Sequence, residues 1–452
     1  MDLEIISKEF IKPSSPTPSN LRTHKLCLFD QYVDHSYASC VHYYPLNHNI
    51  SLSNSSDIDH IVSERLQLLK QSLSETLTHF YTLGGNLKDD YSVDCNDEGV
   101  YFVEARTKSS LKEFLNQPNL SLLSKFIPEE GNERNGRIAG ARVDMIQVTI
   151  FACGGLAIGN TMAHMVADGM TIGLFLKCWA AIASKNMEAA IFPNYNSSLI
   201  FPPVDEDPKD AAWRSLKNPF LKTGRPATRR FVFDAKSMAN LKARATSSGV
   251  QNPSRSEAVS AFLFKQIMVA FKTKSGFHKP HLLSHVVNLR RKIKPSIIEY
   301  SLGNILWHAN ALCTEDEVEL DGLVYGMREA IAKYNGDFVK SLQGDEGFVN
   351  FRKAIKDDGE VCCKAADRVM FTSWCNFGFY DVDFGWGKPI WMSSVGWDEL
   401  ATTFYNFIIL NDTRLRDGVE AWVLLPEEDM ALLELDKELL AFATMDPSPF
   451  DI

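Results

Sequence analysis

The stretch that decides the fold is "TMAHMVADGMTIG", residues 161–173, in which His164 is followed by Asp168 and Gly169. The residues before His164 form an apolar run of strand length. After Asp168, the segment "MTIGLFLKCWAAIA" (170–183) has the three-to-four spacing of apolar residues that is typical of a helix. The stretch therefore predicts a strand, a short loop that carries His164, and a helix that Asp168 opens. Such loops carry functional side chains disproportionately often.

Two interpretations of His164 and Asp168 are open at this point. In the first interpretation, His164 is a catalytic base and Asp168 is its supporting carboxylate. In the second, His164 is structural and Asp168 is a helix N-cap, a position that favours Asp. The sequence contains neither a G-x-S-x-G elbow nor an HExxH zinc motif. Cys153 and Cys375 lack a recognisable reactive setting, and we expect both in the core. This leaves a general base without a covalent nucleophile, as in direct acyl transfer from a thioester to an alcohol.

Composition narrows the class of protein. The net charge of −10 argues against non-specific binding to nucleic acid or to an anionic membrane, because both favour basic surfaces. The start, "MDLEIISKEF", lacks the pattern of a signal peptide, and no apolar run is long enough to span a bilayer. The nine cysteines are scattered without a CxxC pair, which suits neither a disulfide framework nor a zinc site. We expect a cytoplasmic, reduced protein with no metal.

The length of 452 residues is too great for one compact core, so the sequence predicts two domains. Periodic strand and helix patterns alternate in both halves, which indicates an α/β fold. Between about 190 and 225 the periodicity fails and the chain becomes proline-rich and polar, as in a long surface crossing. We therefore predict an N-terminal domain over 1–190, a crossover linker over 191–225 and a C-terminal domain over 226–452.

A second unusual stretch is "FTSWCNFGFYDVDFGWGKPIW", residues 371–391. Its Asp383-Phe384-Gly385 resembles the DFG motif of a protein kinase. The sequence lacks the HRD loop, the glycine-rich phosphate loop and the VAIK-type strand of that family, which argues against a kinase. The two glycines that flank Trp386 predict a tight loop.

HMVADG around His164 and DFGWG from Asp383, in this order, resemble the two signature motifs of the BAHD plant acyltransferases. The likeness covers nearly the whole chain and is strongest to the branch of vinorine synthase and related alkaloid O-acetyltransferases. Its other segments are "IKPSSPTP" (11–18), "LFDQ" (28–31), "VDCNDEGVYFVEA" (93–105), "FACGGLAIG" (151–159), "VVNLRRKIKP" (286–295) and "YSLGN" (300–304). The resemblance implies two chloramphenicol-acetyltransferase-like domains, each a mixed sheet with helices, with His164 in a solvent channel between them.

The resemblance also implies roles for single residues. It makes His164 the catalytic base and pairs Asp168 with Arg290, so that Asp168 holds the loop in shape. It makes the DFGWG loop structural, although Asp383 is often named beside the histidine as a catalytic residue. Trp374 is a candidate donor to the tetrahedral oxyanion through its indole N–H, and the alternative is a core tryptophan.

For coenzyme A the sequence offers "PSRSEAVSAF" (253–262), in which Ser254 and Glu257 form a capping box for the helix predicted over 256–271. A helix N-terminus suits a phosphate, and the resemblance places coenzyme A near this segment. A local positive patch is also expected, and its candidate residues are Lys272, Lys274, Arg291 and Lys292. The alternative is that Ser254 is a plain helix cap and that the basic side chains are only solvated.

Together these observations predict an acyl-CoA-dependent O-acyltransferase. We expect it to transfer acetyl from acetyl-CoA to a hydroxyl of a small plant alkaloid or terpenoid, by general-base catalysis in a ternary complex. Acyl-CoA is then a co-substrate, and no cofactor is bound permanently. Related condensation domains usually carry a second histidine where Ala163 stands, which favours a free acyl-CoA donor. The alternatives are a hydroxycinnamoyl- or malonyl-CoA donor and a non-catalytic ligand-binding protein. We expect a monomer without nucleic-acid or membrane partners.

Overall fold

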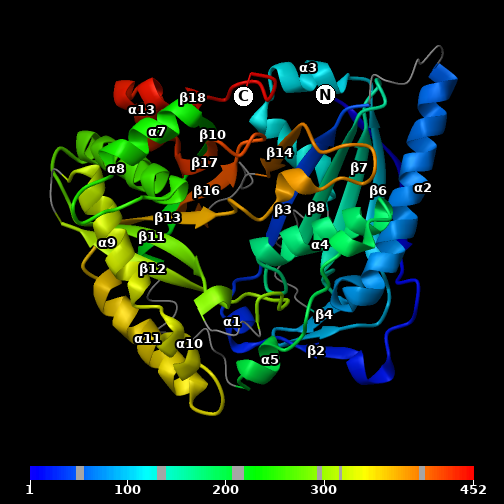
Figure 1. The fold of residues 1–452 in the computed structure, drawn as a ribbon, viewed down its shortest axis with the longest axis horizontal. Coiled ribbons are helices and arrows are strands. Elements are labelled where there is room, and N and C mark those ends of the chain that lie inside the picture. The colour runs from blue at the N-terminus through cyan, green and yellow to red at the C-terminus, as the bar shows by residue number, and fades with distance from the viewer. Residues whose placement is uncertain are drawn as a thin grey trace.

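The computed structural model describes residues 1–46, 55–129, 139–205, 218–292, 298–314, 318–395 and 403–451. Two sheets with helices lie side by side in it (Figure 1), so the predicted α/β class is confirmed. The first sheet has the strand order β1-β6-β7-β8-β3-β14. Its strands are β1 (Leu3–Ile11), β3 (Tyr37–Tyr44), β6 (Val100–Thr107), β7 (Asp144–Ile150), β8 (Leu156–Ala163) and β14 (Trp391–Ser394).

The second sheet has the order β12-β11-β13-β16-β17-β10-β18. Its strands are β10 (Pro226–Phe233), β11 (His281–Asn288), β12 (Leu306–Cys313), β13 (Asp367–Ser373), β16 (Asn406–Asp412), β17 (Val419–Pro426) and β18 (Thr444–Met445). Two small sheets are formed by β2 (Thr23–Lys25), β5 (Ser92–Asp94) and β4 (Asn86–Asp89), and by β9 (Lys222–Thr223) and β15 (Thr403–Phe404).

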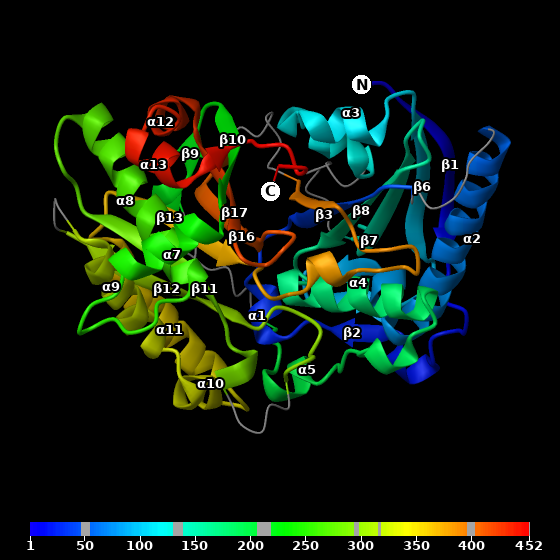
Figure 2. The ribbon, with the colours of Figure 1, turned by 45° about the horizontal axis from the view of Figure 1, so that its top comes forward.

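Long helices cover one face of each sheet (Figure 2). Helices α2 (Ser55–His79) and α4 (Gly169–Ala183) pack on the first sheet through a shared apolar core, and α8 (Arg255–Ser275) is the central helix on the second. The other helices are α1 (Leu28–Gln31), α3 (Leu111–Asn116), α5 (Ser197–Ile200), α7 (Ala235–Arg244), α9 (Leu320–Ala332), α10 (Gly336–Ser341), α11 (Gly347–Cys362), α12 (Glu427–Leu433) and α13 (Lys437–Phe442). In the described part of the chain, none of the helices has the length and apolar character of a membrane span.

The elements predicted from local signals are present. Strands β7 and β8 pair antiparallel across a turn at Gly154, where a φ of +76° favours glycine. Ser254 caps α8, and Glu257 completes the predicted capping box. Asp168 is the N-cap of α4, which follows β8 after a five-residue loop from His164 to Asp168. The predicted strand–loop–helix around His164 is therefore confirmed.

The C-terminal third of the chain contributes to the first sheet. Strand β14 pairs antiparallel with β3, and Phe384 of the DFGWG loop lies in the apolar core beneath α4. The domain boundaries stay a prediction, but the chain returns to the first sheet within the segment assigned to the C-terminal domain. The sequence could not show this return, because the partner of a short strand such as "WMSS" (391–394) is not encoded locally.

A buried network joins β14 to the second sheet. Arg230 of β10 pairs with Glu420 of β17 at 2.9 Å, and both side chains are 1% exposed. The Tyr380 hydroxyl and the Trp391 indole N–H donate to the same carboxylate at 3.0 and 3.4 Å. The Arg230 guanidinium also lies 4.9 Å from the centre of the Trp391 ring, a cation–π contact. The two sheets are therefore held together by charge and aromatic packing on this side.

Candidate active site

His164 lies at the first position of the loop between β8 and α4. Residues 165–168 are buried, whereas His164 itself is half-buried. Its backbone N–H donates to the Ser36 carbonyl at 2.8 Å, and its carbonyl accepts from Asn304 Nδ2 at 2.7 Å. The peptide groups on both sides of His164 are thus fixed, while the imidazole is the side chain of this loop that reaches solvent.

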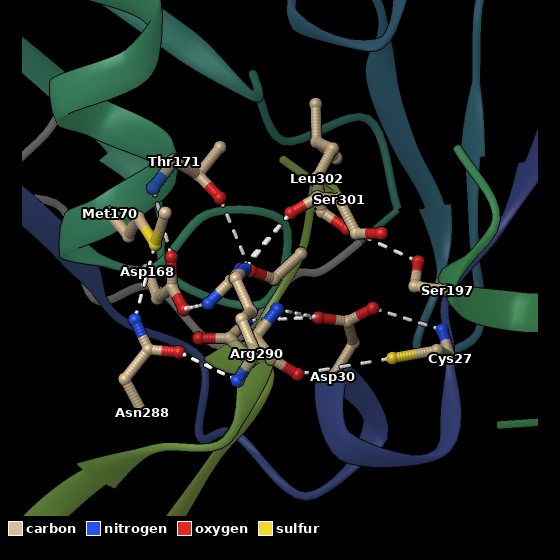
Figure 3. Close-up of polar contacts among 12 residues, drawn as sticks. Cys27, Asp30, Asp168, Met170, Thr171, Ser197, Asn288, Arg290, Ser301 and Leu302 are labelled. Atoms are coloured by element: carbon tan, nitrogen blue, oxygen red, sulfur yellow. Dashed lines mark hydrogen bonds and ion pairs between the residues drawn. The ribbon is translucent and has the colours of Figure 1, made fainter. Parts of the chain in front are cut away.

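Both carboxylate oxygens of Asp168 accept hydrogen bonds from groups other than the His164 ring. Its Oδ1 accepts from the Thr171 backbone N–H at 2.9 Å, which caps α4, and its Oδ2 accepts from Arg290 Nη1 at 2.6 Å (Figure 3). In the described part of the chain, Nδ1 of His164 has no hydrogen-bond partner. Asp168 therefore fixes the start of the helix and the end of the loop, and it does not orient the imidazole.

Arg290 ties the second half of the chain to this loop. It lies in the short helix η7 (Arg290–Lys292) that follows β11, and only 1% of its side chain is exposed. Besides Asp168, its guanidinium donates to the Ser301 carbonyl at 3.1 Å and the Gly303 carbonyl at 2.7 Å (Figure 3). The charge of Arg290 is thus balanced by one carboxylate and two carbonyl oxygens. The structure brings together Asp168 and Arg290, which the sequence analysis paired only by resemblance.

Asp30 of α1 is a second buried carboxylate at the site, and sequence reasoning assigned it no role. Its oxygens accept from the backbone N–H groups of Cys27 at 2.9 Å and Asn304 at 2.6 Å, and from Asn304 Nδ2 at 3.0 Å (Figure 3). Burial raises the pKa of Asp30 to about 6. Gly303 has a φ of +113°, and a Cβ there would lie 3.0 Å from this carboxylate. Asp30 thus holds Asn304, which in turn holds the His164 carbonyl. The signal in the sequence was a carboxylate inside the apolar run "LCLFDQY" (26–32).

Trp374 packs on the start of α4. It is 8% exposed, and its backbone N–H donates to the Leu410 carbonyl at 2.8 Å. A Cβ on Gly169 would lie 2.6 Å from the indole Nε1 of Trp374. The glycine after Asp168 is therefore required because the indole occupies the space of a side chain. This brings a hydrogen-bond donor next to the histidine loop.

Asp383 lies away from the histidine and stabilises its own loop. Its Oδ1 accepts from the backbone N–H groups of Gly385 at 2.8 Å and Gly387 at 2.9 Å. A Cβ on Gly385 would lie 3.6 Å from the Cα of Ser184, at the far end of α4 from His164. A helix of that length spans about 22 Å. The geometry thus places Asp383 in its own loop, away from His164, and any catalytic part of Asp383 stays a prediction.

The residues predicted to hold coenzyme A do not form one site. Ser254 caps the start of α8. Two residues later, the Oγ of Ser256 lies 3.0 Å from the Oγ of Ser373, the residue that precedes Trp374. Lys272 lies at the other end of the same helix, about 27 Å away by helical rise. Its neighbour Lys274 is paired with Glu428 at 2.9 Å and Asp429 at 3.1 Å. Ser254 and Lys272 are therefore separated by the length of α8, and the expected patch of Lys272, Lys274, Arg291 and Lys292 is divided as well, because β11 runs between its two halves.

Of the other two residues of that patch, Arg291 is 74% exposed and pairs with Glu299 at 3.3 Å. Lys292 ends the short helix η7 and is half-buried. Both are next to Arg290 in the chain, so they lie at the histidine end of β11 and not at the Lys272 end.

Cys375 and Cys153, the two cysteines considered as nucleophiles, differ in burial. Burial raises the pKa of Cys375 to about 11, with a smaller contribution from Asp412. Because the thiolate is the reactive form, this thiol is a poor nucleophile. Cys153 is exposed and not in the core, which corrects that expectation, and it lies in the turn between β7 and β8 at the opposite end of β8 from His164.

Known proteins resemble this chain over its full length. The sequence profile of the transferase family matches residues 1–440. The chain is 58% identical to epi-neemfruitin B 7-O-acetyltransferase of Melia azedarach, covering 99% of this chain and 100% of the relative. It is 57% identical to limonoid 7-O-acetyltransferase of Citrus sinensis, with the same shares covered. The chain belongs to the BAHD acyltransferase family.

The crystal structure of the BAHD enzyme vinorine synthase matches with a TM-score of 0.81, 30% identity and 100% of both chains covered. The resemblance stated from the sequence motifs is thus confirmed, and so is the two-sheet architecture. The protein is an acetyltransferase that uses acyl-CoA as its co-substrate, so the non-catalytic alternative is excluded.

Replacing Gly169 with Ala tests the placement of Trp374. The added Cβ overlaps the indole, so the ring must move away from the start of α4. We expect the free energy of unfolding to fall by about 1–3 kcal/mol, as for other overpacked sites. We expect kcat to fall roughly 10-fold or more, because a small misplacement of an active-site group is costly.

The control is Gly326→Ala in α9, where a Cβ meets nothing within 4 Å. Denaturant unfolding and steady-state kinetics measure both effects. A Gly169→Ala enzyme with wild-type kcat would show that turnover does not need the indole at this position.

Proposed function

We propose that this BAHD enzyme transfers the acetyl group of acetyl-CoA to a hydroxyl of a limonoid triterpenoid, and that this hydroxyl is the one at position 7. The observation that carries the proposal is the identity of 58% and 57%, over 99% of the chain, to two enzymes named for that position. This identity narrows the acceptor class, which the sequence analysis gave as an alkaloid or terpenoid alcohol. We further propose that the enzyme works as a monomer in the cytoplasm.

In the proposed mechanism His164 is the general base. The acceptor hydroxyl lies beside the imidazole, which takes its proton while the oxygen attacks the thioester carbonyl. The tetrahedral intermediate then collapses with cleavage of the C–S bond, and the imidazolium returns the proton to the coenzyme A thiolate. Histidine suits both steps because its neutral and charged forms interconvert near neutral pH. The half-buried ring on a fixed loop supports this role.

Trp374 is proposed as a donor to the oxyanion of the intermediate. Its Nε1 lies against Gly169 at the first turn of α4, close in the chain to His164. A preorganised N–H acts where negative charge develops and contributes most in a site shielded from water. Asp168 and Arg290 neutralise each other beneath the loop, and they take part only by fixing it.

The test is the reaction itself. The purified enzyme is incubated with acetyl-CoA and a limonoid that carries a free 7-hydroxyl, and the product is examined by mass spectrometry and NMR. We expect one added acetyl group at position 7, and no product from the matched 7-oxo limonoid. Malonyl-CoA and a hydroxycinnamoyl-CoA serve as competing donors. Acetylation at another hydroxyl, or preference for another donor, would contradict the proposed substrate pair.

In the same assay His164→Ala should lower kcat by roughly 10²–10⁴, the usual contribution of a general base. Its melting temperature should stay close to that of the wild type, because the backbone of residue 164 and not its ring makes the structural hydrogen bonds. A folded variant that retains most of its activity would remove His164 from the mechanism.

A second prediction concerns the kinetic order. Direct transfer needs both substrates bound at once, so initial-rate lines at several fixed acceptor concentrations should intersect. Enzyme incubated with acetyl-CoA alone should gain no acetyl mass after denaturation. Parallel lines together with a stable acetyl adduct would instead indicate a covalent intermediate, and Cys153→Ser and Cys375→Ser would then identify the nucleophile.

A further inference from the structure

Asn304 connects the histidine loop to the second half of the chain. It lies two residues before β12 and is fully buried. Its Nδ2 donates to the His164 carbonyl at 2.7 Å and to Asp30 Oδ1 at 3.0 Å. Both neighbours are oxygen atoms that only accept, so the amide nitrogen and not the amide oxygen must face them. The two N–H groups of one side chain thus bridge a carboxylate and the loop.

The turn within the loop fixes a different carbonyl from the one that Asn304 holds. The backbone N–H groups of Val166 and Ala167 donate to the Ala163 carbonyl at 2.9 and 3.2 Å. The His164 carbonyl, the next along the chain, accepts from Asn304, which is 140 positions away. The peptide group that follows the Cα of His164 is therefore held from outside the loop. A rotation of this peptide group would turn the Cα–Cβ bond of His164 and displace the imidazole.

Asp30 holds the Asn304 amide in this orientation. The Oδ1 of Asp30 accepts from the Asn304 backbone N–H at 2.6 Å as well as from its side chain, and Oδ2 accepts from the Cys27 backbone N–H at 2.9 Å (Figure 3). Both oxygens thus face N–H groups, which suits the ionised carboxylate because it only accepts. A proton on either oxygen would lie against a donor and break one of these hydrogen bonds.

The Asp30 carboxylate takes up a proton in mild acid. Burial raises its pKa to about 6, and the hydrogen bonds from Asn304 and Cys27 lower it only in part. Burial and the neighbouring Asp30 charge also raise the pKa of the Cys27 thiol, so this thiol stays protonated. The other ionisable side chains of the segments around Asp30 are those of His164 and of the pair Asp168 and Arg290. The contact between Asp30 and Asn304 therefore holds at neutral pH and weakens as the pH falls through about 6.

Helix α1, which carries Asp30, is itself fixed to the chain segment that passes between the two sheets. Gln31 Nε2 donates to the Val204 carbonyl at 3.1 Å, and the Val204 backbone N–H donates to Gln31 Oε1 at 3.0 Å. The Leu28 backbone N–H donates to the Phe201 carbonyl at 3.1 Å. Asp30 is therefore presented by a rigid support, as a residue that orients another group has to be.

We propose that Asp30 and Asn304 are positioning residues of the acetyl transfer. The ionised carboxylate of Asp30 orients the Asn304 amide, and this amide fixes the backbone of His164 so that the imidazole lies where it takes the proton of the acceptor. Both residues act through His164 and not on the substrates. The inference rests on the proposed function, since it assumes that His164 is the general base. Misplacing a catalytic group by about 1 Å can lower the rate roughly 10²-fold.

The first experiment compares Asn304→Ala with Asn406→Ala, a matched control in the second sheet. Asn406 is also fully buried, and its Nδ2 donates to a carbonyl and a carboxylate, those of Arg368 and Asp367, both at 3.1 Å. Because the two variants lose the same kinds of contact, we expect similar falls in melting temperature. Only Asn304→Ala should lower kcat, by roughly 10- to 100-fold, and its KM for acetyl-CoA should stay at the wild-type value.

The second experiment compares Asp30→Asn with Asp30→Ala. Asp30→Asn keeps an oxygen that can accept from Asn304 but does not titrate, so it should retain more of the wild-type kcat than Asp30→Ala. Below about pH 6, log kcat of Asp30→Asn should fall less steeply with pH than that of the wild type, with a slope smaller by about one. A purely structural role of Asp30 would leave this slope unchanged, and that result would contradict the inference.

The ring of His164 gives a third readout that needs no substrate. In enzyme made with isotope-labelled histidine, its NMR signal is the one that His164→Ala removes. We expect this signal to shift or broaden in Asn304→Ala and to stay in place in Asn406→Ala. If Asn304→Ala does not fold, the nearly isosteric Asp30→Asn is examined at low and neutral pH instead, and its His164 signal should change less with pH than that of the wild type.

Wild-type kcat together with a wild-type His164 signal in Asn304→Ala would overturn the inference. Equal losses of kcat in Asn304→Ala and Asn406→Ala would overturn it as well, because any loss of a buried amide would then have the same effect. A wild-type enzyme that fails to acetylate the limonoid would contradict the proposed acceptor, and the His164 signal would then decide the inference by itself.

Discussion

The ion pair between Asp168 and Arg290 is the interaction on which the rest of the site depends. It joins the first turn of α4, on the first sheet, to the segment that follows β11, on the second sheet. The two side chains are 7% and 1% exposed, so neither charge is compensated by water. A buried pair adds little net stability over apolar packing, but the loss of one partner leaves an uncompensated charge and costs about 3–5 kcal/mol. The pair therefore fixes the start of α4 relative to the segment after β11.

The pair is the centre of a wider polar network under the histidine. Arg290 also holds the carbonyls of Ser301 and Gly303, and Asn304 links Asp30 to the His164 carbonyl. The loop is thus fixed by segments that are far apart in the sequence. These contacts fix the backbone of the loop between the strand and the helix that it joins.

The sequence correctly predicted the features that depend on residues close together in the chain. The β7–β8 hairpin, the Asp168 cap and the Ser254 capping box follow from residues within a few positions of one another. His164 stood out because it combined a strand end, a loop and a helix cap. The positions of these elements relative to one another came only from the family resemblance.

What the sequence could not predict depends on distant contacts. The pairing of β14 with β3, the space that Trp374 takes from Gly169 and the support of Asn304 by Asp30 all join remote residues. The patch that included Lys272 failed for a related reason. Lys272 and Lys274 end α8 before β11, whereas Arg291 and Lys292 follow β11, so the strand separates the two pairs.

The most direct test of this account is a double-mutant cycle between the two residues of the ion pair. Asp168→Asn, Arg290→Met and the double variant are compared with the wild type in free energy of unfolding and in kcat. If the pair acts by fixing the loop, each single change costs about 3–5 kcal/mol, and the double change costs less than their sum by up to about 3 kcal/mol. Activity should then fall together with stability in both single variants. An Asp168→Asn enzyme that is as stable as the wild type yet inactive would contradict the account, because Asp168 would then act on His164 itself.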